Sequence, residues 1–262
     1  MLGAIIGDII GSRFEWNNIH TKEFELFTDK CFFTDDSIMT LAVAQAIMDS
    51  EGDYARLGEN AVRCMQETGR PYPHCGYGGS FMQWMYSDDP KPYNSYGNGA
   101  AMRIGACAFA AKTVEEVKML ARAVTEVTHN HPEGIKGAEA TAVAAFTARM
   151  GKNKKDIEAL IDSEYYPMNF TLDGIRDSYY FNETCRMTVP QALKAFFESE
   201  SFEDAMRNAI SIGGDSDTLA AITGTVAQAY YGIPDDIAQK AEAYLDDCLA
   251  GILTAFEARY GR

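Results

Sequence analysis

The sequence lacks the features that would place it in a membrane or outside the cell. It has no apolar run long enough to span a bilayer. Its apolar start, from Met1 to Asp8, has no basic segment of the kind that opens a secretory signal peptide. Its six cysteines are scattered, with no closely spaced pair of the kind that binds zinc. We therefore expect a cytoplasmic protein with reduced cysteines and no membrane association.

Positive charge is also scarce. The chain has 23 lysines and arginines against 38 aspartates and glutamates, which gives a net charge of −15. A field of this sign repels phosphate backbones and argues against nucleic-acid binding by charge, although a local basic pocket is compatible with it. Such acidity also fits a protein that gathers carboxylates around divalent cations.

The size and composition are those of a folded globular protein. The 262 residues are 47% hydrophobic and 23% charged, which excludes intrinsic disorder. No linker, repeat or low-complexity tract divides the chain. We expect one domain over residues 1–262, with a core large enough to need no disulfide or metal for folding.

Alternating β-branched runs are nearly absent, and Ala-rich segments with helical period dominate. The sequence therefore predicts an all-α protein. The predicted helices are 35–49, 53–68, 99–112, 114–127, 133–150, 153–162, 190–199, 201–210, 217–231 and 235–259, the last being bent or divided in two. Three long irregular segments, 13–33, 70–98 and 163–189, interrupt the pattern, and such loops often carry function.

Two predicted helices begin with unusually many oxygen-bearing side chains. Thr34, Asp35 and Asp36 open the first of them. Thr or Asp at a helix start is most simply an N-cap. Two adjacent carboxylates and a hydroxyl exceed what one cap needs, however, and are ligands that Mg²⁺ prefers.

The segment Gly213-Gly214-Asp215-Ser216-Asp217-Thr218 repeats this design. The two glycines allow a sharp turn, and Asp215, Asp217 and Thr218 supply oxygen ligands. The later ligands of a calcium-binding EF-hand are missing. A second N-cap is the alternative, but two such helix starts could together hold a pair of metal ions.

The N-terminal segment carries three glycines at helical spacing, Gly3, Gly7 and Gly11. They form a small-residue face, which for Gly3 and Gly7 indicates close helix packing. Asp8 lies in the same apolar helix and requires a buried partner or an exposed face. Glu15 follows the end of the periodic pattern and could project into a cleft.

Two further segments could contact a ligand. Gly97-Asn98-Gly99, followed by helix formers, is compatible with an anion cradle of backbone N–H groups, with a tight turn as the alternative. His129 lies between two predicted helices, close to His131 but with no nearby cysteine or third histidine. We interpret His129 as a cleft or substrate contact rather than a zinc ligand; a helix C-cap or a surface residue is the alternative.

Taken together, these segments resemble the ADP-ribosylglycohydrolase family, which includes the dinitrogenase-reductase-activating glycohydrolases and the ADP-ribosylhydrolases. The resemblance covers the whole chain in the order GAIIGDIIGSRFE, FTDDS, NSYGNGAAMR, VTHNHPEG and GGDSDTLAAITGTVAQAYYG. It implies a single-domain orthogonal bundle of many α-helices, with a binuclear Mg²⁺ or Mn²⁺ centre in a central cleft.

The resemblance also assigns roles to individual residues. It implies that one half of the metal site is Thr34, Asp35 and Asp36, and that the other half is Asp215, Asp217 and Thr218. Glu15 matches a glutamate that in some members gates the cleft or binds a metal. The loop that holds the diphosphate and the distal ribose matches Ser95, Tyr96, Gly97, Asn98 and Gly99, and His129 matches a substrate contact.

The reaction implied is hydrolysis of the bond at the anomeric carbon of ADP-ribose attached to a protein side chain, arginine or serine, or to a small acceptor. The metals would bind the ribose hydroxyls and a water, and Asp36, Asp217 or Glu15 would take a proton from that water. Tyr93, Tyr96 and Phe14 are candidates for stacking on the adenine or lining the cleft, with core packing as the alternative for each.

Two other functions are compatible with this pattern. A non-catalytic ADP-ribose-binding or structural protein on the same fold is one, since the family includes lens crystallins, but the presence of all six candidate metal ligands argues against it. A phosphoesterase with the same two cations is the other, and it would release AMP instead of ADP-ribose.

Overall fold

The structure is a computed structural model, and it describes residues 1–261. Over these residues it is built of α-helices and two 3₁₀ turns, and the only β pairing is an isolated bridge between Gly97 and Thr184. The prediction of an all-α bundle is confirmed. The helices are α1 (Leu2–Gly11), α2 (Asp35–Asp49), α3 (Leu57–Gly69), α4 (Gly79–Met85), α5 (Gly99–Met102), α6 (Gly105–Ala110), α7 (Val114–Thr125), α8 (Pro132–Arg149), α9 (Lys154–Glu164), α10 (Leu172–Ile175), α11 (Cys185–Phe197), α12 (Phe202–Ile210), α13 (Ser216–Tyr231), α14 (Asp235–Glu242) and α15 (Asp247–Tyr260), and the 3₁₀ turns are η1 (Ser12–Phe14) and η2 (Tyr54–Arg56).

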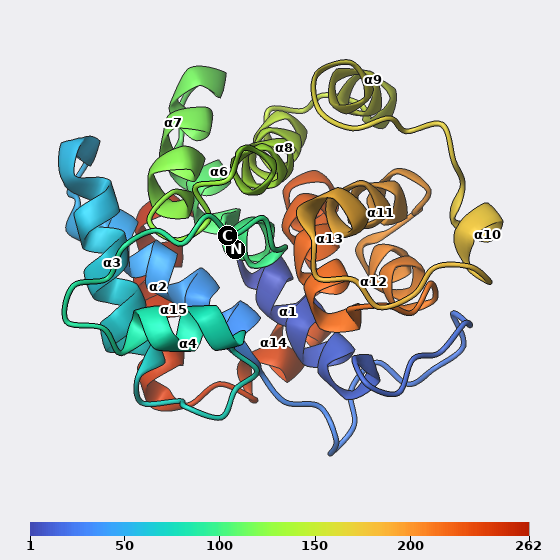
Figure 1. Ribbon diagram of the computed structural model, residues 1–262. Helices are drawn as coiled ribbons and strands as arrows, with labels where there is room; N and C mark the ends of the chain where they lie inside the picture. The colour runs from blue at the N-terminus through green and yellow to red at the C-terminus, as the bar shows by residue number, and fades with distance from the viewer. Residues whose placement is uncertain (262) are drawn as a thin grey trace.

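Helices α1 and α13 run side by side through the middle of the bundle (Figure 1). All ten residues of α1 are buried, as is α13 from Ser216 to Gln228. Helices α11 and α12 lie on one side of this pair, and α2, α3 and α15 on the other (Figure 1). Helix α1 has no exposed face, and this explains why nearly all of its residues are apolar.

The glycine face of α1 packs directly against α13. A Cβ atom on Gly7 would lie 2.6 Å from the backbone nitrogen of Ala221, and one on Gly11 would lie 2.5 Å from the Cα of Asp217. The packing predicted for Gly3 and Gly7 is confirmed, and Gly11 extends it. This close approach brings the end of α1 to the start of α13, where Asp217 lies.

Several predicted helix boundaries were wrong. The predicted helix 99–112 is interrupted after Met102, because Arg103 and Ile104 both have ψ near 0° and redirect the chain between α5 and α6. The predicted helix 53–68 starts as the 3₁₀ turn η2. The division of 235–259 into α14 and α15 agrees with one of the two predicted forms.

Helix α11 begins five residues before the predicted start at Pro190, which lies inside the helix. A proline cannot donate the hydrogen bond expected within a helix. The first turn of α11, which precedes the proline, is held by a neighbouring loop: the N–H of Cys185 donates to the carbonyl of Tyr96 at 3.0 Å. Short helices α4 and α10 also lie within segments that the sequence predicted to be irregular.

The cysteines are free, and Cys64, Cys107 and Cys185 are buried in helices. This agrees with the prediction of reduced cysteines. Among residues 1–261, no helix combines the length and the apolar character needed to cross a membrane.

Candidate active site

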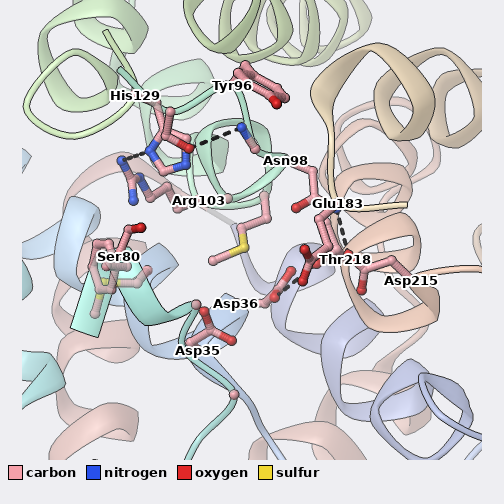
Figure 2. A pocket seen from close by; sticks show the side chains of 18 of the residues that line it. Asp35, Asp36, Ser80, Tyr96, Asn98, Arg103, His129, Glu183, Asp215 and Thr218 are labelled. Carbon is pink, nitrogen blue, oxygen red and sulfur yellow. Dashed lines mark hydrogen bonds between the residues drawn. The ribbon is translucent and has the colours of Figure 1, made fainter. Parts of the chain in front are cut away.

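A cleft of about 450 Å³ opens where the starts of α2 and α13 meet the loop before α5. This volume lies in the range of small-molecule sites. The lining residues surround it from several elements far apart in sequence (Figure 2). Of the predicted metal-binding, catalytic and substrate-loop residues, only Thr34 does not line the cleft. The others do, and they are Glu15, Asp35, Asp36, Ser95, Tyr96, Gly97, Asn98, Gly99, His129, Asp215, Asp217 and Thr218.

Thr34 lies behind the cleft wall and is the N-cap of α2. Its hydroxyl accepts from the N–H of Asp36 at 3.3 Å and donates to Oδ1 of Asp8 at 2.7 Å. The other oxygen of Asp8 accepts from the backbone N–H groups of Thr34 and Ser37, at 2.9 and 3.0 Å. Asp8 thus has the buried partners that its place in an apolar helix requires, and it fixes the start of α2 to α1.

The second half of the site depends on two glycines. Gly213 and Gly214 have φ of +71° and +78°, which only glycine adopts readily. A Cβ atom on Gly214 would also overlap the ring of Tyr179. The turn presents Asp215, whose Oδ2 accepts from the side-chain amide of Asn98 at 2.6 Å.

The two halves meet across the cleft. The Thr218 hydroxyl donates to Oδ2 of Asp36 at 3.2 Å. Glu15, Asp215 and Asp217 each place a carboxylate oxygen within 4.8 Å of the others. The structure therefore brings both oxygen-rich helix starts and Glu15 to one place, as the sequence analysis proposed.

This donor set fits a divalent cation. Oδ1 of Asp36 is buried and has no hydrogen-bond partner in the part of the chain that the structure describes. An unpaired buried carboxylate oxygen is costly, and one or more cations among these oxygens would remove that cost.

The pKa values show the same crowding of negative charge. Burial, and then the charge of Asp217, raise the pKa values of Asp35, Asp36 and Asp215 well above the usual range. The same two causes raise the pKa of Glu15 to about 7. Each of these carboxyls is therefore harder to ionise than an ordinary surface carboxylate.

The loop before α5 forms another wall of the cleft, but it offers fewer free backbone N–H groups than an anion cradle requires. The N–H of Gly97 donates to the Ser95 hydroxyl at 3.2 Å, and the N–H of Asn98 donates to the carbonyl of Glu183 at 2.7 Å. Two of the backbone donors that the sequence offered to an anion are therefore used within the protein. The side chains of Ser95, Tyr96 and Asn98 still reach the cleft.

His129 is a neutral residue of the cleft wall. Burial, and then the charge of Arg103, lower its pKa well below the usual range. Its Nδ1 lies 2.7 Å from the Thr128 hydroxyl, which itself accepts from Arg103 Nη2 at 2.6 Å. With Nδ1 accepting the hydroxyl proton, the imidazole carries its own proton on Nε2, and Nε2 faces Gly97 and Gly99.

Arg103 was missed by the sequence analysis as a site residue. Its side chain is 1% exposed, and it lies beside His129 in Figure 2. Among the described residues of the cleft lining, it is the only arginine or lysine. Its position at the end of the NSYGNGAAMR segment was the available signal, but that segment gave no reason to distinguish it from an exposed helix-end arginine.

The three aromatic side chains predicted to stack on a ligand or line the cleft do not all lie in the cleft. Tyr93 and Tyr96 line the cleft, whereas Phe14 is buried with its ring edge-on to Phe24 at 5.2 Å. Stacking of Phe14 on a ligand is therefore excluded by its packing in the core. Ser80, Phe81 and Glu183 also line the cleft and were not predicted.

Known proteins resemble this chain in sequence and in fold. A family model described as ADP-ribosylglycohydrolase matches residues 1–261. The chain is 24% identical to ADP-ribosylhydrolase ARH3 of Homo sapiens, over 93% of this chain and 88% of that protein. It is 27% identical to ADP-ribosylarginine hydrolase Tri1 of Pseudomonas putida, over 89% of this chain and 70% of that protein.

A solved structure titled ADP-ribosylglycohydrolase-related protein complex has the same fold. It superposes with a TM-score of 0.70 at 23% identity, and the match covers 100% of this chain and 97% of the other.

Proposed function

The chain belongs to the ADP-ribosylglycohydrolase family, and we propose that it is a divalent-cation-dependent hydrolase that releases ADP-ribose from a protein side chain, arginine or serine, or from a small acceptor. The observation that carries the proposal is the convergence of Glu15, Asp36 and Asp217 with their neighbours in one cleft. The names of the relatives, an ADP-ribosylhydrolase and an ADP-ribosylarginine hydrolase, support the substrate class.

We assign the cations, two Mg²⁺ or Mn²⁺, to the oxygens of Asp35, Asp36, Asp215, Asp217 and Thr218. Thr34 belongs to this set only through its hydroxyl, which is already bonded to Asp8. When bound, such cations polarise substrate oxygens and make a water more acidic.

The protein's own residues position the reaction. Asn98 orients Asp215, and Thr218 orients Asp36. Asp36, Asp217 and Glu15 are the candidates for the group that takes the proton from water. Glu15 is favoured, because it is the least buried of the three and lines the cleft without belonging to the residues assigned to the cations.

On the opposite wall, neutral His129 presents its Nε2–H. Ser95 and Tyr96 add hydroxyl groups to the same wall, whereas the amide N–H groups of Asn98 are already donated to Asp215 and Thr188. The imidazole and hydroxyl donors suit the oxygens of a diphosphate or a ribose. The buried guanidinium of Arg103 adds positive charge behind them.

Product analysis separates this proposal from the alternatives. The protein is incubated with ADP-ribosylated peptides and Mg²⁺, and the nucleotides released are identified by chromatography. Free ADP-ribose supports the proposal. AMP as the product would instead indicate a phosphoesterase, and bound ADP-ribose with no product would indicate a binding protein.

A further inference from the structure

Two aromatic rings stack in the open at the edge of the candidate active site. The rings of Trp16 and Phe181 have centroids 4.9 Å apart and planes 25° apart. Trp16 is 75% exposed even though it stacks on Phe181. The outer face of its indole is therefore open to solvent, and exposed apolar groups at a cleft are typical of interaction sites.

The pair lies at the cleft because both of its segments are fixed to the same turn. Asn18 accepts from the N–H of Gly214 and donates to its carbonyl, both at 2.8 Å, which holds the segment of Trp16. Tyr179, on the segment of Phe181, packs against Gly214. Gly214 directly precedes Asp215 of the cleft wall.

Two glutamates close in sequence to the pair line the cleft. Glu15 directly precedes Trp16, and Glu183 follows Phe181 by two residues; both line the cleft. Glu183 is exposed and lies near Asp215 and Thr218 in Figure 2. Even with the charge of the inner aspartates offset by cations, Glu183 keeps this edge negative.

We propose that Trp16, Phe181 and Glu183 form the subsite for the acceptor, and that it selects a planar cation, the guanidinium of an ADP-ribosylated arginine. The inference rests on the proposed function. A guanidinium stacks on an indole face and pairs with a carboxylate. A serine acceptor has neither a plane nor a charge, and a nucleic-acid end is repelled by the carboxylates.

Steady-state kinetics on two peptides test the subsite. Peptides of one sequence carry ADP-ribose on arginine or on serine. We expect the wild-type protein to prefer the arginine-linked peptide, and Trp16→Ala to lower kcat/KM on it about five- to tenfold. The same change should leave the serine-linked peptide and the affinity for free ADP-ribose within about twofold.

Two further variants separate stacking from charge. Trp16→Phe keeps an aromatic face and should recover most of the preference, and Glu183→Gln should lower both the preference and its dependence on salt. Tyr86→Ala, at an exposed aromatic outside the cleft lining, is the matched control and should change nothing. A wild-type preference for serine, or equal losses on both peptides in Trp16→Ala, would overturn the proposal.

A binding measurement tests the acceptor subsite even if neither peptide is hydrolysed. The chain has two tryptophans, so Trp84→Phe leaves Trp16 as the only indole fluorophore. We expect agmatine, a guanidinium probe, to change this fluorescence saturably, and N-acetylserinamide or butylamine not to. A response to agmatine without hydrolysis would contradict the proposed function and retain the acceptor subsite; equal responses to all three probes would reject the subsite.

Discussion

The hydroxyl of Thr218 donates a hydrogen bond of 3.2 Å to Oδ2 of Asp36, across 182 residues of sequence. This bond joins the starts of α2 and α13, the two oxygen-rich segments of the candidate metal site. The other oxygen of Asp36 has no partner among the described residues. One oxygen is thus oriented by the protein, and the other is left for a ligand.

Asp217→Asn should abolish turnover and leave the fold intact. Because Asp217 raises the pKa values of several neighbouring carboxyls, its loss also relieves repulsion in the metal-free protein. We expect activity to fall by about 10²-fold or more, the metal-free melting temperature to hold or rise, and the Mg²⁺-induced increase in melting temperature to disappear. Thermal unfolding with Mg²⁺ and with EDTA measures both temperatures.

Asp89→Asn, at an exposed carboxylate of the surface, is the control and should behave like the wild type. An Asp217→Asn protein that keeps full activity, or its full thermal response to Mg²⁺, would contradict the assignment of Asp217 to the metal site.

The stability of the metal-free protein should fall as the pH rises from about 4 to about 7. Burial, and then Asp217, raise the pKa of Asp8 and of Glu15 to about 7. A carboxyl whose pKa is higher in the folded state binds more protons there, so its stabilising effect is full below the unfolded pKa and is lost as the pH passes the folded pKa.

Urea unfolding in EDTA at several pH values measures this slope. With saturating Mg²⁺ the slope should flatten, because the cation favours the ionised carboxylates. A metal-free stability that rises across this interval would contradict the crowding of carboxyls in the cleft.

His129 should remain neutral through the pH range in which an ordinary histidine takes up a proton, with its own proton on Nε2. Burial and Arg103 both lower its pKa, and Nδ1 faces the Thr128 hydroxyl. Nitrogen-15 NMR of the imidazole reports both the protonation state and the tautomer. Arg103→Met should raise the pKa of His129, because it removes a positive charge; titration of wild-type His129 near its ordinary value would refute this account.

Gly11→Ala should destabilise the protein and reduce activity, because the added Cβ would meet the backbone of Asp217 at 2.5 Å. Overpacking of this kind costs about 1–3 kcal/mol. Gly251→Ala in α15 is the matched control: its Cβ would meet nothing within 4 Å, and the change should stabilise the protein by up to about 1 kcal/mol. Equal unfolding free energies for the two variants would show that α1 does not need its glycine face.

The sequence predicted the helical bundle and both oxygen-rich helix starts, because each depends on local signals. The period of apolar residues marks α2, α7, α8 and α12, and the clustered aspartates and glycines mark the starts of α2 and α13. The glycine face of α1 likewise predicts close helix packing, but it does not indicate which helix packs against it.

The features that the sequence did not predict depend on contacts between distant segments. The break between α5 and α6 accompanies the burial of Arg103 beside Thr128 and His129. The early start of α11 depends on the carbonyl of Tyr96. The stack of Trp16 on Phe181 joins two segments that the sequence analysis described only as irregular.

The most direct test of the central claim is the rate at which the protein releases ADP-ribose from an ADP-ribosylated peptide after its metal is removed with EDTA and Mg²⁺ is then restored. We predict that release stops in EDTA and returns with Mg²⁺, and that Asp217→Asn shows no return. Release that continues at the full rate in EDTA would contradict the account, because the carboxylates that meet in the cleft would then not act through a cation.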